Sequence, residues 1–212
     1  MSKIRLVFLS ALAVVAVSAV AVASASAAMP AYSINSLLTV ESKKLTAASA
    51  VLEGTLAGVK VKIECETEKG SGEIENSSVT GTGLSNATVH YTQCTVAAPA
   101  GQGCLVNNGL VLVTAHDALE LGGPTSFKDK FSPGPGLPFT TISIDGCTTT
   151  ALNGNFNVTG TATALANNAN STLEFTTTSG SALKFGGNPA TYVDTVLVLM
   201  AGGGTITVIN EK

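Results

Sequence analysis

The chain has 212 residues and a formal net charge of −3, and only 12% of its residues are charged, about half of the roughly 25% usual in globular proteins. The absence of a basic surface argues against nucleic-acid binding, because nothing would neutralise the phosphates. Aromatic residues make up 5% of the chain and tryptophan is absent, so threonine, serine, asparagine and glycine fill the positions that remain, as is typical of extended β surfaces.

The first 28 residues have the order of a secretory signal peptide. Lys3 and Arg5 form a basic start, residues 6–23 are apolar apart from two serines, and small residues follow. We expect cleavage after Ala27 or Ala28, export by the general secretory route, and a secreted or cell-surface product without a membrane span. An uncleaved anchor is the alternative, because an apolar run of about 18 residues is near the lower limit for a spanning helix.

Residues 29–212 are predicted to form a single β domain. Residues 36–50 are compatible with a helix, although their threonines and valines weaken that reading. Residues 59–65 then alternate apolar and charged side chains without a break, which indicates a strand with one apolar face. Glu64, Glu66 and Glu68 are expected on the opposite face, as a solvated edge.

The middle of the chain is a series of short strand patterns. Residues 110–113 form a continuous apolar run, which predicts a strand buried on both faces. Residues 115–121 are compatible with one helical turn, and residues 132–138, rich in proline and glycine, with a long irregular loop. Further alternating segments are 142–144, 156–164, 173–175 and 183–185. Short strands between turn pairs such as Asn108-Gly109 predict an all-β sandwich, with a barrel as the alternative.

The C-terminal segment is predicted to close the sheet with a hairpin. Residues 196–200 are a second continuous apolar run, and three glycines at 202–204 separate them from residues 206–209. If these strands formed an open edge, they would allow self-association between chains.

Four cysteines, Cys65, Cys94, Cys104 and Cys147, all follow the predicted signal peptide. An even number in an exported chain predicts two disulfides, for which three connectivities exist. We expect a local Cys94–Cys104 bond, because residues 99–101 can turn the chain between them, and a Cys65–Cys147 bond between strands. No pair has the close spacing of a zinc or redox site, so no metal is predicted.

These landmarks occur in a recognisable order. Ile63-Glu64-Cys65 precedes Gly70-Ser71-Gly72, residues 90–95 lead to Gly103-Cys104, and Asp145-Gly146-Cys147 precedes Val158-Thr159-Gly160. Over about residues 55–165 the chain thereby resembles a group of short exported actinobacterial proteins of unknown function. The resemblance implies secretion and a disulfide framework, and it implies no activity.

Residues that could carry catalysis are few. His90 is expected on the polar face of a strand, and His116-Asp117 follows a buried strand, where loops carry function. A serine triad also needs an exposed nucleophile, and no GxSxG motif is present. Ser181 and Lys184 match the S-x-x-K string, but they lie in a strand-like segment. Pieces of a calcium loop occur at Asp145-Gly146 and at residues 153–155.

The sequence therefore predicts a protein that is not an enzyme and has no cofactor, metal or catalytic site. We expect a secreted or cell-surface β-sandwich with an unknown ligand. The alternatives are a structural subunit of a surface layer or fimbria, and a weak carbohydrate- or calcium-binding module.

Overall fold

The structure of the protein, a computed structural model, describes residues 29–33, 38–44, 49–76, 83–122, 126–201, 204–206 and 208–211. The predicted signal peptide lies outside these residues. Every regular element in them is a β-strand apart from two short 3-10 turns, so the all-β prediction is confirmed. In the same residues, no helix is long and apolar enough to cross a membrane.

The strands are β1 (Met29–Tyr32), β2 (Leu38–Lys44), β3 (Ala50–Leu56), β4 (Val59–Asn76), β5 (Gly83–Ala98), β6 (Leu105–Val106), β7 (Leu110–Leu121), β8 (Phe127–Ser132), β9 (Thr140–Asp145), β10 (Gly154–Asn167), β11 (Thr172–Phe175), β12 (Ala182–Phe185), β13 (Asn188–Met200) and β14 (Val208–Glu211). The 3-10 turns are η1 (Asn107–Gly109) and η2 (Thr150–Leu152).

The main sheet is antiparallel and closes on itself through two circuits of strand pairs that share the long strands β4, β5, β10 and β13. One circuit runs β4–β5–β7–β8–β10–β11–β13–β2 and returns to β4. The other runs β4–β5–β6–β9–β10–β12–β13–β3 and returns to β4. The strands that face each other across the core therefore belong to one closed sheet. Its hydrogen bonding is that of a barrel, the alternative to the predicted sandwich.

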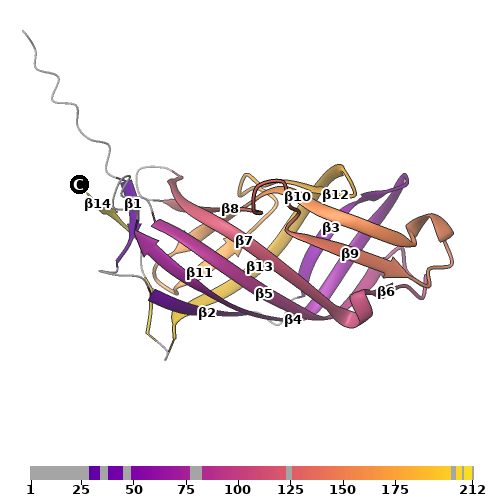
Figure 1. The fold of residues 1–212 in the computed structure, drawn as a ribbon, viewed down its shortest axis with the longest axis horizontal. Helices are drawn as coiled ribbons and strands as arrows, with labels where there is room; N and C mark the ends of the chain where they lie inside the picture. Colours follow the sequence, from indigo (N-terminus) through magenta and orange to yellow (C-terminus); the bar gives the residue numbers. More distant parts are fainter. Residues whose placement is uncertain are drawn as a thin grey trace, which may run out of the picture.

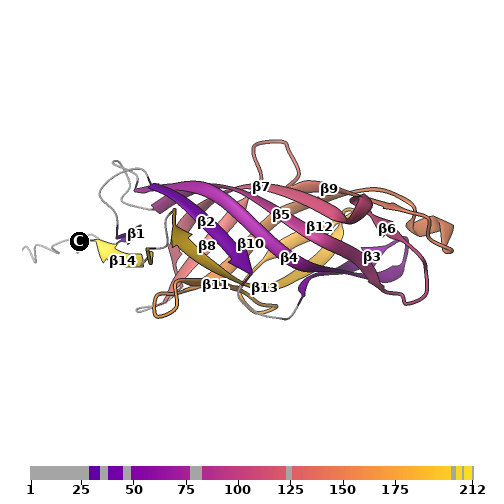
Figure 2. The same ribbon diagram turned by 90° about the horizontal axis from the view of Figure 1, so that it is seen from below.

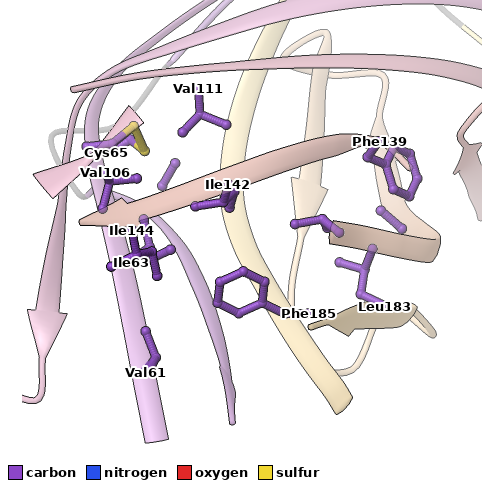
Figure 3. Packing of buried hydrophobic residues seen from close by; sticks show 14 of the residues in the cluster. Val61, Ile63, Cys65, Val106, Val111, Phe139, Ile142, Ile144, Leu183 and Phe185 are labelled. Carbon is purple, nitrogen blue, oxygen red and sulfur yellow. A yellow bond between two sulfur atoms is a disulfide. The ribbon is translucent and has the colours of Figure 1, made fainter. Parts of the chain in front are cut away.

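The two circuits occupy opposite ends of an elongated molecule, as Figures 1 and 2 show. Strands β3, β6, β9 and β12 lie at the end that we call the packed end. Its interior is filled by large side chains that are at most 2% exposed, among them Val61, Val106, Ile144 and Phe185 (Figure 3). The Phe185 ring meets Phe156 edge-on, with 5.9 Å between centroids. These side chains form the core of this end.

At the opposite end, β1 and β14 pair with each other in a separate two-stranded sheet, and we call this the plugged end (Figure 1). Tyr32 of β1 and Val208 of β14 are buried, together with Ile206. The Asn168 side chain holds Val208 by accepting from its N–H at 2.8 Å and donating to its carbonyl at 2.7 Å. The Ser171 hydroxyl donates to the Ile206 carbonyl at 3.1 Å.

The predicted C-terminal hairpin is only partly present. The Met200 N–H donates to the Gly204 carbonyl at 2.8 Å, and Leu199 forms an isolated bridge with Thr205. The last strand then leaves residues 196–200 and pairs with β1 instead. Residues 196–200 pair with β2 on one side. On the other side Val196 and Leu197 pair with β11, and the Val198 N–H donates to the Ser171 carbonyl at 2.8 Å.

Two segments read as helical in the sequence are strands in the structure. Residues 38–44, from the first of them, form β2, and residues 45–48 lie outside the described part. Residues 115–121 continue β7, because every second residue there faces the interior: Ala115, Asp117 and Leu119 are buried. Pairing with neighbouring strands on both sides outweighs the weak helical pattern.

The run 110–113 is also not buried on both faces. Val111 is 4% exposed, whereas Leu110 and Leu112 are each 46% exposed on the outer face. The outer surface of the closed sheet has no further layer over these leucines in the described residues, so a continuous apolar run here does not mean two-sided burial. Residues 133–139, by contrast, form the irregular connection expected between β8 and β9.

All four cysteines form disulfides, but the predicted connectivity is wrong. The bonds are Cys65–Cys94 and Cys104–Cys147. Cys65 and Cys94 are directly opposite each other in the β4–β5 register, which is set by a hairpin pairing that the cysteine spacing alone does not reveal. Cys104 instead lies beside Cys147, where Gln102 accepts hydrogen bonds from the Thr148 and Thr149 N–H groups at 3.0 and 2.9 Å.

Candidate functional site

A cavity of about 210 Å³ lies inside the closed sheet. Its wall is formed mainly by aliphatic and aromatic side chains such as Val111, Phe139, Ile142 and Val196, contributed by strands on all sides. The cavity reaches the plugged end, where Tyr32, Ile206 and Val208 line it. None of the four large residues that fill the packed end belongs to its lining. Other residues of the packed end do line it, among them Leu52 of β3, Ile142 of β9 and Leu183 of β12, so the cavity runs along most of the interior.

The cavity exists because several inward positions carry very small side chains. Gly72 of β4, Ala87 of β5 and Ala115 of β7 form one row across three neighbouring strands, and all three line the cavity. On β10 the lining positions Ala162 and Ala166 are also alanines. Methyl groups and a glycine cannot reach the facing wall, so the space between the walls stays open where larger residues would fill it.

A buried network of phenols and a carboxylate crosses the interior. The hydroxyl oxygens of Tyr91 and Tyr192 lie 2.7 Å apart, and Tyr192 donates to Oδ2 of Asp194 at 2.8 Å. The Tyr192 ring packs edge-on against Tyr91 and Phe175, with centroids 6.3 and 5.1 Å apart. Burial, the Asp194 carboxylate and, for Tyr91, Glu68 raise the pKa of both phenols, so both remain neutral hydrogen-bond donors.

Glu68 corrects the prediction that three glutamates share a solvated face. Glu66 is exposed and Glu64 is partly exposed, but Glu68 is only 3% exposed and lines the cavity. The register is the same on both sides of this point, because Cys65 pairs with Cys94 and Thr67 with Thr92. The backbone is irregular here, with a φ of 55° at Gln93, and the inward face shifts by one residue, which turns Glu68 inward.

A second polar group lies at the plugged end of the cavity. The Tyr32 hydroxyl donates to Oδ2 of Asp117 at 3.1 Å, and Asp129 is close enough to Asp117 for the two carboxyls to influence each other. Asp117 is 5% exposed and Asp129 only 2%. Burial raises the pKa of Asp117, and burial together with the Asp117 charge raises the pKa of Asp129 well above its ordinary value. Asp129 lines the cavity.

The sequence did contain a signal for these buried acids. In residues 127–131 the order Phe-Lys-Asp-Lys-Phe puts Asp129 on the same strand face as two phenylalanines. In residues 192–196 the same alternation puts Asp194 on the face of Tyr192 and Val196. An acid between apolar partners at a two-residue spacing indicates burial, but neither acid was among the predicted site residues.

The two histidines do not join a catalytic arrangement. His90 is exposed, as expected. His116 is exposed on the outer face of β7, where its Nδ1 hydrogen-bonds Oδ1 of Asn86, whereas its neighbour Asp117 points inward. Adjacent residues of a strand face opposite sides, so this His-Asp pair cannot act as a unit. Ser181 Oγ accepts from the Thr163 N–H at 2.9 Å and Lys184 is exposed on β12, so these two residues do not converge on a site.

The pieces of the expected calcium loop lie near one another but are occupied by structural contacts. The Asn153 side chain accepts from the Cys147 N–H at 2.8 Å and donates to the Cys147 carbonyl at 3.2 Å. Asp145 accepts from the Ser143 hydroxyl at 2.8 Å. Among the described residues, no group of three or more His, Cys, Asp or Glu side chains is arranged to hold a metal ion.

Comparison with known protein families, with curated proteins and with solved structures gives no match to this chain.

Proposed function

We propose that this is an exported, non-catalytic binding protein that holds one small, mainly apolar molecule inside its closed sheet. The observation that supports the proposal is the 210 Å³ cavity. Closed sheets of about eight strands either fill their interior with side chains or hold one small ligand. In this protein large side chains fill part of the interior at the packed end, and the cavity leaves room for a ligand toward the plugged end.

The volume defines the size of ligand. An apolar cavity of roughly 150 Å³ accepts benzene, so a cavity of 210 Å³ suits a molecule of about eight to ten non-hydrogen atoms. Burial of that molecule would gain about 25 cal/mol for each Å² of apolar surface removed from water. The apolar lining would select against strongly hydrated ligands, because their polar groups would lose water without gaining partners.

The proposed export rests on two features. The order of basic, apolar and small residues in the first 28 positions is that of a secretory signal peptide. The two disulfides are typical of extracellular proteins, where they persist in an oxidising environment. A protein that captures small apolar molecules outside the cell or at its surface accounts for both features.

The other candidate functions have less support. Assembly by strand exchange needs an open edge; Val196 and Leu197 are paired on both sides, with β2 and β11, so the only open edges near these segments in the described residues belong to the short β1–β14 sheet. Carbohydrate binding commonly uses exposed aromatic rings, and the chain's three tyrosines, Tyr32, Tyr91 and Tyr192, all line the interior cavity.

Calorimetric titration of the exported chain with ethylbenzene tests the proposed function. We expect one molecule bound per chain, and loss of binding in Ala162→Leu, because the added side chain fills the cavity that Ala162 lines. The matched control is Thr161→Leu on the same strand, whose side chain alternates to the outer face and which should bind as the wild type does. Absence of ethylbenzene binding in the wild type, or equal binding in Ala162→Leu, would contradict the proposal.

A further inference from the structure

The buried charges of the interior have one sign only. Four carboxyl side chains are at most 5% exposed in the described residues, namely those of Glu68, Asp117, Asp129 and Asp194. In the same part of the chain no lysine or arginine is buried. Buried carboxylates are costly unless a cation or several donors compensate them. Donors of the protein compensate part of these acids, since Tyr32 donates to Asp117 and Tyr192 and the Thr195 N–H donate to Asp194, but the described residues supply no buried cation.

Asp129 is the carboxyl best placed to meet a ligand. Its side chain lines the cavity, and its Oδ1 atom has no hydrogen-bond partner although the residue is 98% buried. On β8 it lies between Phe127 and Phe131, and Phe131 also lines the cavity. An acceptor oxygen left without a donor in apolar surroundings costs about 1–3 kcal/mol, more when it is charged. A ligand that brings a donor to this atom removes that cost.

A second unsatisfied atom lies in the same cavity but on another strand. Thr172, the first residue of β11, is 3% exposed, lines the cavity, and its hydroxyl has no hydrogen-bond partner. Asp129 and Thr172 belong to separate strands on either side of β10. Two buried polar side chains from different strands, both open toward one apolar space, indicate a ligand with a polar group as well as an apolar body.

We propose that the ligand of this cavity is a small apolar amine, and that Asp129 binds its ammonium group. An ammonium offers three donors and a positive charge, whereas a hydroxyl or amide offers donors alone. The charge decides between them, because the interior holds four acids against no base. The apolar body of the amine would occupy the space left by the small residues Gly72, Ala87 and Ala115. This inference rests on the proposed function, since it assumes that the cavity is a binding site.

Four probes of similar size separate charge from shape: ethylbenzene, benzyl alcohol, benzylamine and benzoate. Each is titrated into the wild-type exported chain at mildly alkaline pH, where benzylamine is still protonated and ionisation of the buried carboxyls is favoured relative to acidic pH. We expect benzylamine to bind about tenfold or more tightly than ethylbenzene and benzyl alcohol, and benzoate to bind most weakly, because charge-assisted hydrogen bonds exceed neutral ones. This comparison needs no variant.

The variant Asp129→Asn tests whether Asp129 is the residue that binds the ammonium group. We expect the variant to lose the preference for benzylamine while it binds ethylbenzene as the wild type does. The control is Asp145→Asn, which removes an exposed carboxylate near the packed end and should keep the preference. If Asp129→Asn does not fold, Thr172→Val replaces it, with a smaller expected loss that leaves ethylbenzene binding intact.

The outcomes distinguish the two proposals. If ethylbenzene binds and benzylamine binds no better than ethylbenzene or benzyl alcohol, the cavity is a binding site but the amine inference is wrong. If the preference for benzylamine survives in Asp129→Asn, the assignment to Asp129 is wrong. If ethylbenzene does not bind, the proposed function fails, and if none of the probes binds, the inference fails with it.

Discussion

The two disulfides enclose separate loops, and removing them should cost stability in a predictable amount. The bonds join cysteines 29 and 43 residues apart, and the two loops do not overlap in the sequence. The entropy lost from the unfolded chain on closing such loops corresponds to about 3.6 and about 4 kcal/mol at room temperature. Because the loops are independent, the effects should add to about 7–8 kcal/mol, a large part of the 5–15 kcal/mol usual for a domain.

The experiment compares three variants with the wild type: Cys65→Ala/Cys94→Ala, Cys104→Ala/Cys147→Ala, and the variant that lacks all four cysteines. Urea unfolding is followed by far-ultraviolet circular dichroism, because the chain contains no tryptophan. With a slope of about 2 kcal/mol per molar urea, each missing bond should lower the midpoint by roughly 2 M.

The experiment has two controls, and certain results would refute the loop-entropy reasoning. Peptide mapping without reduction must show the same two bonds in the wild type, and each two-cysteine variant must retain the other bond. A loss of unfolding free energy below about 1 kcal/mol for either bond would refute the loop-entropy reasoning. The reasoning would also be refuted if the variant that lacks all four cysteines were as stable as a variant that lacks two.

Three further predictions concern the core, the buried acids and a close approach of two strands. Phe185→Ala should lower the free energy of unfolding by about 3–5 kcal/mol, because the ring is fully buried, whereas Lys184→Ala on the outer face should change it by less than about 0.5 kcal/mol in the same urea assay. Burial raises the pKa of Asp129, so the folded protein holds a proton that the unfolded chain releases, and this contribution to stability is present in acid and lost as pH rises through the raised pKa. Asp129→Asn should therefore gain stability relative to the wild type as pH rises above about 4, and a constant difference across pH would contradict this. Gly72→Ala should destabilise by about 1–3 kcal/mol, because a Cβ would lie 2.1 Å from the Asn86 carbonyl oxygen, and an unchanged melting temperature would show that β4 and β5 can separate there at no cost.

Alternation in the sequence predicted the local structure well wherever a strand has one face inside and one outside. Val61, Ile63 and Cys65 face inward as the pattern of residues 59–65 requires. The pattern failed at Glu68, because the inward face shifts by one residue on both β4 and β5 near Gln93, and the order of residues in β4 does not mark the shift. It failed at Leu110 and Leu112 because an apolar run does not say whether a second layer covers it.

Long-range features could not be read from the sequence for a related reason. The pairing of Cys65 with Cys94 depends on the register of β4 and β5, and that of Cys104 with Cys147 on where two loops meet. The cavity depends on Gly72, Ala87 and Ala115 lying in one row, and these residues are far apart in the chain. Small residues in strands are unremarkable one by one, and they leave a space only when the register aligns them.

The pairing of β1 with β14 has a consequence for the order of folding. In the described residues β1 pairs with β14 alone, so the two-stranded sheet at the plugged end forms only once residues from both ends of the described chain are present. If the cavity binds a ligand as we propose, the late joining of these two strands is the step that would cover the ligand at this end.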